Sequence, residues 1–303
     1  MDKTPDASGS TPDAQSTTET TMTTGHTMSQ TPQRILITGG ASGLGRAMAE
    51  AWLRDGARVL IGDVNQERAA ETLAALKDLP GELQFQYLDV RDAASFNNAR
   101  EWLEQNWGGL DVLVNNAGVA GAARIDRGDM ADWDWIFDIN VKGVVRGCKV
   151  FVPMMKRQGH GHIVNIASLA GLLHAPVMGS YNVTKAGVIS LSETLRFELA
   201  PYGIHTTVVC PGFFRTNLHE SMRTPEPGMI ETVDKLLSSD ELTADQIAEM
   251  IKKAVAKQQF FLLPHKSGRR AYWMKRFLPF VFNRVMLKGA ERLQGKLEKA
   301  EKA

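Results

Sequence analysis

A glycine-rich turn between a short apolar run and a helical pattern is the feature that most restricts how this chain can fold. The run Arg34–Thr38 (RILIT) predicts a buried parallel strand, and residues 39–45 (GGASGLG) lead from it into an amphipathic helix. Such a turn lets the backbone approach a pyrophosphate at the positive N-terminal end of the helix. A turn without a ligand is the alternative, but the strand before it and the helix after it make that reading the weaker one.

The alternation of apolar runs and helical patterns continues through most of the chain. Strands are expected at 58–62, 83–88, 112–114, 162–167, 205–209 and 259–263, and helices at 66–76, 93–107, 131–157, 179–199 and 244–257. Short connections between them predict one parallel, doubly wound sheet of Rossmann type, in a three-layer α/β/α arrangement. Asn140 lies in an apolar stretch of the longest helical segment, where a local bend is expected.

Polar residues recur where the predicted strands end, at the edge where doubly wound sheets bind ligands. Asp63, Asp89, Asn116 and Ser168 all hold this position. Asp63 follows the glycines by about 20 residues, where an acid hydrogen-bonds the adenosine ribose and repels a 2′-phosphate. We therefore expect NAD rather than NADP, although Arg46 beyond the turn keeps NADP open. Capping of the next helix is the alternative role for Asp63.

Tyr181 and Lys185 are four residues apart in a predicted helix, and so lie on one face of it. An ammonium near a phenol stabilises the phenolate and lowers the tyrosine pKa from about 10 toward neutrality. Such a tyrosine can take a proton from an alcohol or give one to a carbonyl. The alternative is that the two residues belong to an ordinary amphipathic surface.

Composition argues against several other classes of protein. A net charge of +1 gives no field that would attract nucleic acid. Cys148 and Cys210 cannot form a disulfide framework, so a reducing compartment, the cytoplasm, is expected. The seven histidines form no metal-ligand pattern, and no run predicts a membrane span. Residues 1–33 are rich in Ser and Thr and are expected to be a disordered tail.

Together these motifs resemble the single-domain branch of the short-chain dehydrogenase/reductase family, over about residues 33–264. The residues that carry the resemblance are Thr38-Gly39-xxx-Gly43-x-Gly45, Asp89-Val90, Asn115-Asn116-Ala117-Gly118, Asn140, Ser168, Tyr181-xxx-Lys185, Pro211-Gly212 and Thr216. They stand in the order and spacing of the family. No single motif is specific, but the set is.

The resemblance implies an NAD(P)(H)-dependent oxidoreductase that interconverts a secondary alcohol and a ketone or aldehyde. Tyr181 would be the general acid/base, Lys185 would lower its pKa and hold the nicotinamide ribose, and Ser168 would hold the substrate oxygen. Asn140 would hold a water in a proton relay. The residues implied to bind the cofactor are Gly39, Ser42, Gly43, Leu44, Gly45, Asp63, Asp89, Val90, Asn116, Tyr181, Lys185, Pro211, Gly212 and Thr216. Relatives commonly form homodimers or homotetramers, which are expected here too.

Two segments depart from a minimal family member. Within the catalytic domain, expected at 34–265, residues 213–240 hold Pro, Gly and Met without clear periodicity and are expected to form a lid. In the extension 266–303, residues 266–288 combine Lys and Arg with aromatic residues and contain no acid, which predicts an amphipathic segment that contacts a membrane. Completion of the core, coverage of the cleft and a subunit contact are the alternatives. Pro279 is expected to kink or divide this segment.

The methionines of the lid favour a bulky apolar substrate of the steroid, retinoid or long-chain type. His174 and His219 are further candidates to line the substrate cleft. An NADPH-dependent carbonyl or 3-oxoacyl reductase is the second hypothesis, against which Asp63 argues. A nucleotide-binding redox sensor is a third, of another class, and it would not need the acid/base pair.

Overall fold

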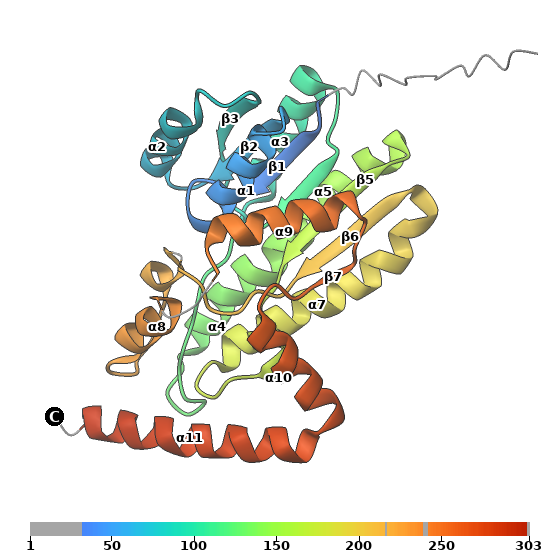
Figure 1. Ribbon diagram of the computed structural model, residues 1–303. Coiled ribbons are helices and arrows are strands. Elements are labelled where there is room, and N and C mark those ends of the chain that lie inside the picture. Colours follow the sequence, from blue (N-terminus) through green and yellow to red (C-terminus); the bar gives the residue numbers. More distant parts are fainter. Residues whose placement is uncertain (1–31, 216, 239–241, 302–303) are drawn as a thin grey trace, which may run out of the picture. The chain divides into compact units, whose positions relative to one another are not determined.

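A seven-stranded, all-parallel sheet with the order β3-β2-β1-β4-β5-β6-β7 forms the centre of the protein (Figure 1). The computed structural model describes residues 32–215, 217–238 and 242–301, so the tail expected at 1–33 lies almost entirely outside the described residues. The strands are β1 Arg34–Thr38, β2 Arg58–Asp63, β3 Glu82–Tyr87, β4 Val112–Asn115, β5 Gly161–Ile166, β6 Ile204–Val209 and β7 Phe261–Leu262. The predicted Rossmann-type sheet is confirmed.

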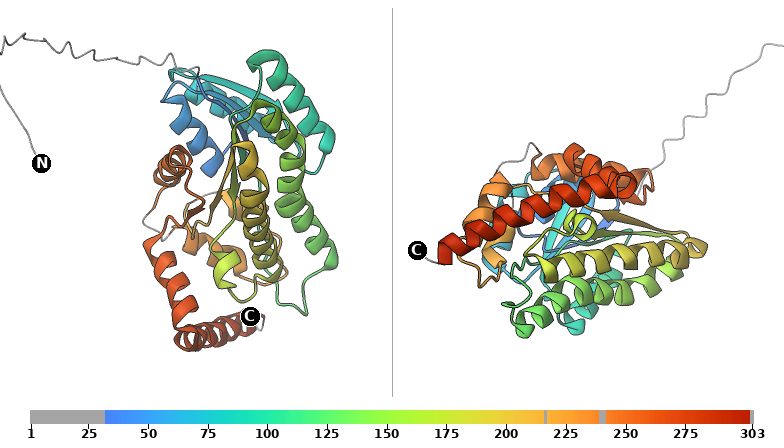
Figure 2. Two further views of the ribbon diagram at one scale, coloured as in Figure 1. Left: turned by 90° about the vertical axis from the view of Figure 1, so that its right-hand side faces the viewer. Right: turned by 90° about the horizontal axis from the view of Figure 1, so that it is seen from below.

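Helices cover both faces of this sheet (Figure 2). They are α1 Gly43–Leu53, α2 Gln66–Leu76, α3 Ala93–Trp107, α4 Met130–Phe137, α5 Gly143–Gln158, α6 Ala170–Leu173, α7 Gly179–Leu199, α8 Met229–Ser238, α9 Ala244–Ala256, α10 Lys266–Phe277 and α11 Pro279–Glu301. One core cluster joins the sheet to α1 and α9, through residues such as Trp52 and Ile251. A second core joins the opposite face to α3, α5 and α7, through Phe96, Phe151 and Leu195. These two cores hold one layer of helices on each face of the sheet, which gives the three-layer α/β/α arrangement.

The predicted helical segment 131–157 is divided by a π-helical turn, Asp138–Lys142, between α4 and α5. Asn140 lies in this turn and is buried, so the expected bend occurs at the polar residue that suggested it. Such π-bulges are frequent at functional sites. Pro279 begins α11 and so divides the C-terminal extension into two helices, as expected, although the second helix is long.

The sequence of the region 213–240 shows no clear periodicity, yet part of the region is helical. It contains a 3-10 helix, Asn217–Ser221, and the ten-residue helix α8. The buried residues Met229 and Val233 are spaced by one helical turn on α8 and pack against partners from distant parts of the chain. Because that burial depends on tertiary partners, the local sequence gives only a weak helical signal.

Helix α6 packs directly on the catalytic helix α7. A Cβ atom at Gly171 would lie 2.6 Å from the backbone carbonyl carbon of Lys185, so only glycine permits this approach. Gly187 is different, because a Cβ there would lie 3.9 Å from Val141 at ordinary contact distance. The short helix after Ser168 is therefore held against the backbone of Lys185.

We expect Gly171→Ala to lower the free energy of unfolding by about 1–3 kcal/mol, because the added methyl forces α6 and α7 apart. Gly187→Ala is the matched control on α7 and should be neutral or stabilising by up to about 1 kcal/mol, because alanine favours a helix interior. Urea denaturation of both variants measures the difference. Equal stabilities for the two would contradict the packing described.

Candidate active site

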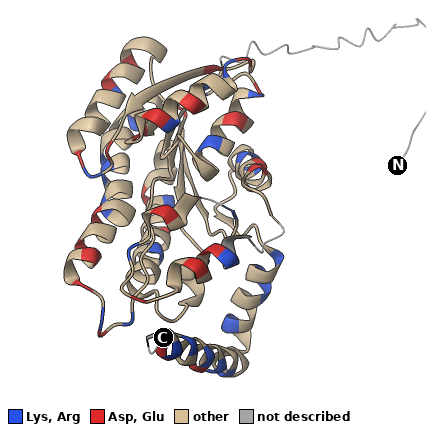
Figure 3. Cartoon of the chain, turned by 90° about the vertical axis from the view of Figure 1, so that its left-hand side faces the viewer, with Lys and Arg blue, Asp and Glu red and all other residues tan. Residues whose placement is uncertain are grey.

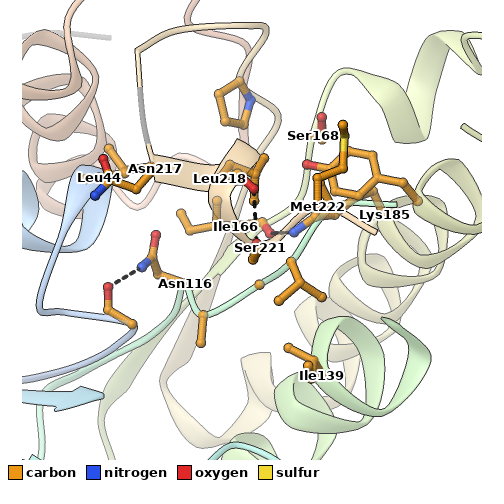
Figure 4. Close-up of a pocket in the computed structure, with 18 of the residues that line it drawn as sticks. Leu44, Asn116, Ile139, Ile166, Ser168, Lys185, Asn217, Leu218, Ser221 and Met222 are labelled. Carbon is orange, nitrogen blue, oxygen red and sulfur yellow. Dashed lines mark hydrogen bonds between the residues drawn. The ribbon is translucent and has the colours of Figure 1, made fainter. Parts of the chain in front are cut away.

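One cavity of about 620 Å³ at the carboxyl ends of the strands collects most of the residues that the sequence singled out (Figure 4). The predicted residues that line it are Gly39, Ser42, Gly43, Leu44, Asp63, Asp89, Val90, Asn116, Ser168, Tyr181, Lys185, Pro211 and Gly212. Gly45 and Asn140 are buried and do not line it, and Thr216 lies outside the described residues. His174 and His219 do not line it either.

The glycine-rich turn brings the N-terminal end of α1 to the cavity wall. Gly39 and Gly43 have φ angles of 64° and 51°, in the left-handed region that glycine adopts without strain. Gly45 packs beneath the turn, where a Cβ would lie 2.0 Å from the carbonyl oxygen of Gly39. Ser42 makes no side-chain cap to the helix, so the first amide groups of α1 face the cavity. This cradle fits a pyrophosphate.

Asn116 follows the neighbouring strand β4 and braces this turn together with Thr38, the last residue of β1. The Asn116 side-chain amide donates to the carbonyl oxygens of Thr38 and Gly39, at 2.9 and 3.0 Å. The Thr38 hydroxyl accepts hydrogen bonds from the backbone amides of Asn116 and Ala117. Asn116 therefore shapes the turn besides lining the cavity. The role of Thr38 was missed, because a β1–β4 hydrogen bond spans 78 residues of sequence.

Asp63 lies at the end of β2 and lines the cavity. Its two carboxylate oxygens accept hydrogen bonds from the backbone amides of Ala41 and Asn65, each at 3.0 Å. Asn65 caps α2 by accepting a hydrogen bond from the Arg68 amide, so the capping role considered for Asp63 belongs to Asn65. The carboxylate is fixed at the adenosine end of the expected site.

A basic side chain near Asp63 was missed by sequence reasoning. Arg68 also lines the cavity, one turn into α2, whereas Arg46 does not. Arg68 forms an ion pair with Glu220, and this pairing raises the pKa of its guanidinium. Asp89, at the end of β3, is likewise paired, with Arg91, whose hydrogen bonds lower the pKa of the carboxyl group. Arg68 and Asp89 thus both bring charge to the cavity wall, and each is paired with a residue of opposite charge.

Ser168, Tyr181 and Lys185 meet at the opposite end of the cavity. Ser168 follows β5, while Tyr181 and Lys185 lie one turn apart on α7 and are 7% and 5% exposed. The Tyr181 hydroxyl forms a hydrogen bond with Ser168, and the Lys185 ammonium donates to the carbonyl oxygen of Ile166 at 2.9 Å. The ammonium nitrogen lies 5.7 Å from the Tyr181 ring centroid. A hydroxyl, a phenol and an ammonium thus share one small region.

Burial governs the ionisation of this group. It raises the pKa of Tyr181 to about 12, against the opposite effect of the Ser168 hydrogen bond. It lowers the pKa of Lys185 to about 8, while the nearby Cys210 thiol acts in the other direction. The pKa of Tyr181 is therefore shifted opposite to the lowering expected from Lys185, because desolvation dominates. At neutral pH the phenol is a neutral donor and the lysine is mostly charged.

Asn140 lies behind this group rather than in the cavity. Its side chain accepts a hydrogen bond from the Val119 amide and donates one to the Val119 carbonyl, both at 2.9 Å. A Cβ at Gly118 would lie 3.2 Å from Asn140 Oδ1 and 3.4 Å from Lys185 Nζ. Asn140 thus braces the loop after β4 and faces the same side of Gly118 as the ammonium. Its part in a proton relay stays a prediction.

The remaining wall of the cavity is mostly apolar and is closed in part by the segment 213–238. Its apolar lining residues include Ala120, Trp135, Ile139, Leu169, Leu173, Met178, Phe213, Phe214, Leu218, Met222 and Val233. Figure 4 shows Leu218, Ser221 and Met222 of this segment facing Ile166 and Ile139 across the cavity. An apolar cavity of this kind binds a substrate mainly through shape and burial.

A buried ion pair attaches this segment, the expected lid, to the loop after β4. Glu226 is 3% exposed, and its carboxylate accepts hydrogen bonds from the backbone amide and the guanidinium of Arg124, at 2.9 to 3.1 Å. Burial raises the pKa of Glu226, but the hydrogen bonds and charge of Arg124 outweigh it, so the pKa lies below its usual value. Arg223 adds backbone hydrogen bonds to Ala120 and Ala122.

The C-terminal extension also takes part in this end of the protein. Leu293 and Leu297 of α11 pack with Ala122 and with lid residues Met222 and Val233 in one cluster. The segment from Ala290 is rich in Lys, Arg and Glu but has a buried side, which partly supports the alternative that the extension covers the cleft. None of the helices within the described ranges is long and apolar enough to cross a bilayer.

The parallel sheet, the glycine-rich turn and the Ser168–Tyr181–Lys185 group define a Rossmann-fold oxidoreductase. The family model for short chain dehydrogenases matches residues 33–227. The chain therefore belongs to the short-chain dehydrogenase/reductase family.

Proteins similar to this chain carry different activities and cofactors in their names. The chain is 37% identical over 187 residues to the 3-oxoacyl-[acyl-carrier-protein] reductase FabG of Thermotoga maritima, which covers 62% of this chain and 76% of that protein. A short-chain dehydrogenase/reductase from Burkholderia phymatum, solved in complex with NAD, superposes with a TM-score of 0.77 at 30% identity, over 81% of this chain and 93% of that one. An alcohol dehydrogenase from the archaeon Thermococcus sibiricus, complexed with 5-hydroxy-NADP, gives a TM-score of 0.67 at 25% identity, over 77% and 96%.

We expect Glu226→Gln to loosen the lid, because the partly buried Arg124 guanidinium loses its ion pair with the buried Glu226 carboxylate. Cleavage by a protease within residues 213–240 should become about tenfold faster, which corresponds to about 1.4 kcal/mol. Glu220→Gln, which removes an exposed ion pair of the same lid, is the control and should change the rate less than about threefold.

The stabilisation that the Arg124–Glu226 ion pair provides should depend on pH. Because the pKa of Glu226 is lowered by folding, its stabilisation is complete above about pH 4.5 and is lost as the pH falls through the lowered value. Acid should therefore reduce the difference between the wild-type chain and Glu226→Gln. A difference that grows on acidification would contradict the ion pair.

Proposed function

We propose that this protein is an NAD(H)-dependent oxidoreductase that interconverts a bulky apolar secondary alcohol and its carbonyl compound. The observation that carries the proposal is that Ser168, Tyr181 and Lys185 line the same cavity as the N-terminal end of α1, opposite an apolar wall. Bound in the cavity, NAD would supply the hydride acceptor or donor at its nicotinamide ring. The remaining chemistry falls to the side chains of this chain.

Ser168 and Tyr181 would act on the substrate oxygen. In reduction, both hydroxyls donate hydrogen bonds to the carbonyl oxygen, and Tyr181 gives it a proton as negative charge develops there. The neutral phenol described above has the correct protonation state for this direction. In oxidation, Tyr181 must first lose its proton, and the Lys185 ammonium stabilises the resulting charge. Asn140 would support the relay of that proton through Lys185.

Asp63 supports NAD over NADP. Its fixed carboxylate would accept hydrogen bonds from ribose hydroxyls and repel a 2′-phosphate. Arg68 is the residue on which the opposite preference would depend, although its guanidinium is engaged by Glu220. Pyrophosphate would be held by the amides at Gly43 and Leu44, and Val90 would flank the adenine ring.

The apolar wall supports a substrate of the steroid, retinoid or long-chain type. Trp135, Phe213 and Met222 would contact its body, with the reacting oxygen directed at Ser168. A 3-oxoacyl reductase is the second candidate, and the similarity to FabG favours it. Turnover of short polar 3-oxoacyl thioesters in preference to apolar ketones would select that candidate.

Assembly and location are proposals of the same kind. A homodimer or homotetramer through α4, α5 and α7 is expected, and a cytoplasmic location with peripheral membrane contact through residues 266–288 remains the expectation from composition. Exposed apolar residues on α7, such as Phe197, support a subunit contact there.

Replacing Tyr181 by Phe should lower kcat by about 10²- to 10⁴-fold, because the general acid is removed. The Kd for NADH should stay within about threefold of the wild-type value. Tyr202→Phe, at the far end of α7, is the control and should leave kcat unchanged. A redox sensor would instead show no turnover in any variant, while still binding the cofactor.

The chain should bind NAD about tenfold or more tightly than NADP, because about 1.4 kcal/mol of repulsion at Asp63 opposes the 2′-phosphate. Asp63→Ser should reduce the preference for NAD over NADP, because it should weaken the binding of NAD and strengthen the binding of NADP. Fluorescence titration of both cofactors measures the two constants. Tighter binding of NADP by the wild-type chain would overturn the assignment of Asp63 and point to Arg68.

A further inference from the structure

The corner between α10 and α11 exposes an apolar and basic surface that no part of the described chain covers. Seven of the sixteen exposed large apolar residues recorded among the described positions lie between Trp273 and Leu287. We call these residues the apolar corner, and they are Trp273, Phe277, Leu278, Phe280, Val281, Val285 and Leu287. Phe277 and Phe280 are 68% and 79% exposed, and Trp273 stacks on Phe277 with a centroid distance of 5.3 Å.

The charged residues of the segment that holds the apolar corner are all positive up to Glu291. Residues 266–290 contain seven Lys and Arg and no Asp or Glu. Arg269 and Lys275 donate inward, to backbone carbonyls of the domain. The exposed cations that have no ion pair among the described residues are Lys266, Arg270, Arg276, Arg284 and Lys288. Figure 3 shows basic positions and no acidic ones along α10.

The helix pair packs against the rest of the domain on its inner side. Gly268 lies against Leu169, Lys275 donates to the Leu172 carbonyl, and Leu297 at the other end of α11 packs with Met222 and Val233. The apolar residues of the corner therefore lie on the outer side of helices that are already packed against the domain. They remain exposed on a helix pair whose inner side is already packed, and a contiguous apolar patch of this kind marks an interaction site.

We propose that the apolar corner docks this protein on an anionic lipid bilayer. Aromatic residues interleaved with Lys and Arg are the chemistry of an interfacial helix, in which the rings enter the headgroup region and the cations meet anionic lipids. A second copy of the chain is the less suitable partner. A two-fold contact would bring each cluster of cations against itself with no acid to neutralise it.

Docking here would place the substrate cavity near the bilayer. Lys275 donates hydrogen bonds to the Leu172 carbonyl and to the His174 ring, in the segment that supplies Leu173, Ala175 and Met178 to the cavity wall. Helix α11 runs from the corner to the lid cluster (Figure 1). Membrane docking rests on the proposed function, because it would let the protein take an apolar alcohol or ketone directly from the membrane.

The test is co-sedimentation of the full chain with vesicles of phosphatidylcholine alone and of phosphatidylcholine mixed with phosphatidylserine. We expect binding to the anionic vesicles only, decreasing as salt is raised. The double variant Phe277→Ser/Phe280→Ser should bind at least about tenfold more weakly, as should Arg276→Gln/Arg284→Gln/Lys288→Gln. Ile125→Ser removes an apolar side chain that is 82% exposed from the loop after β4, and this control should bind as the wild type does.

Circular dichroism melting first establishes that all variants are folded. The proposal is overturned if the wild-type chain ignores anionic vesicles or if the corner variants bind them as well as it does. It is also overturned if the variants change only the oligomeric state in size-exclusion chromatography, because the occupant is then a second copy. The readout needs no turnover, so an inactive chain that binds vesicles refutes the proposed function alone.

Discussion

The structure depends on the burial of Tyr181 and Lys185 side by side at the ends of the central strands. A phenol and an ammonium this poorly hydrated respond strongly to each new charge or hydrogen bond. The sheet fixes them through the Ile166 carbonyl and Ser168, and α6 presses on the backbone of Lys185 through Gly171. Burial keeps the tyrosine protonated by raising its pKa to about 12. Burial also lowers the pKa of Lys185, but only to about 8, so the lysine stays mostly charged at neutral pH. This combination suits proton donation to a carbonyl.

The sequence was sufficient where local patterns determine structure. The strand runs, the turn glycines and the helical periodicities are local signals, and α2, α3 and α7 begin and end where they were predicted. The positions of Asp63, Asn116 and Ser168 could also be predicted, because parallel strands end at a common edge. Thirteen of the sixteen predicted site residues line one cavity for that reason.

Interactions between distant residues could not be predicted. The brace of Asn116 on the glycine-rich turn, the ion pair of Arg124 with Glu226 and the approach of Arg68 to the cavity join residues far apart in the chain. Helix α8 was missed because its burial depends on such partners. The sign of the Tyr181 pKa shift was also missed, since the helical spacing of Tyr181 and Lys185 says nothing about how deeply both are buried.

The central claim is that burial keeps Tyr181 neutral in the protein alone, even with the Lys185 ammonium beside it, and that the further positive charge of bound NAD⁺ is needed to ionise it. Ultraviolet difference titration of the wild-type chain against Tyr181→Phe isolates this phenol from the other tyrosines. We predict no Tyr181 phenolate below about pH 10 in the protein alone, and its appearance at lower pH once NAD⁺ is saturating. A phenolate near neutral pH without NAD⁺, or a titration that NAD⁺ leaves unchanged, would contradict the account.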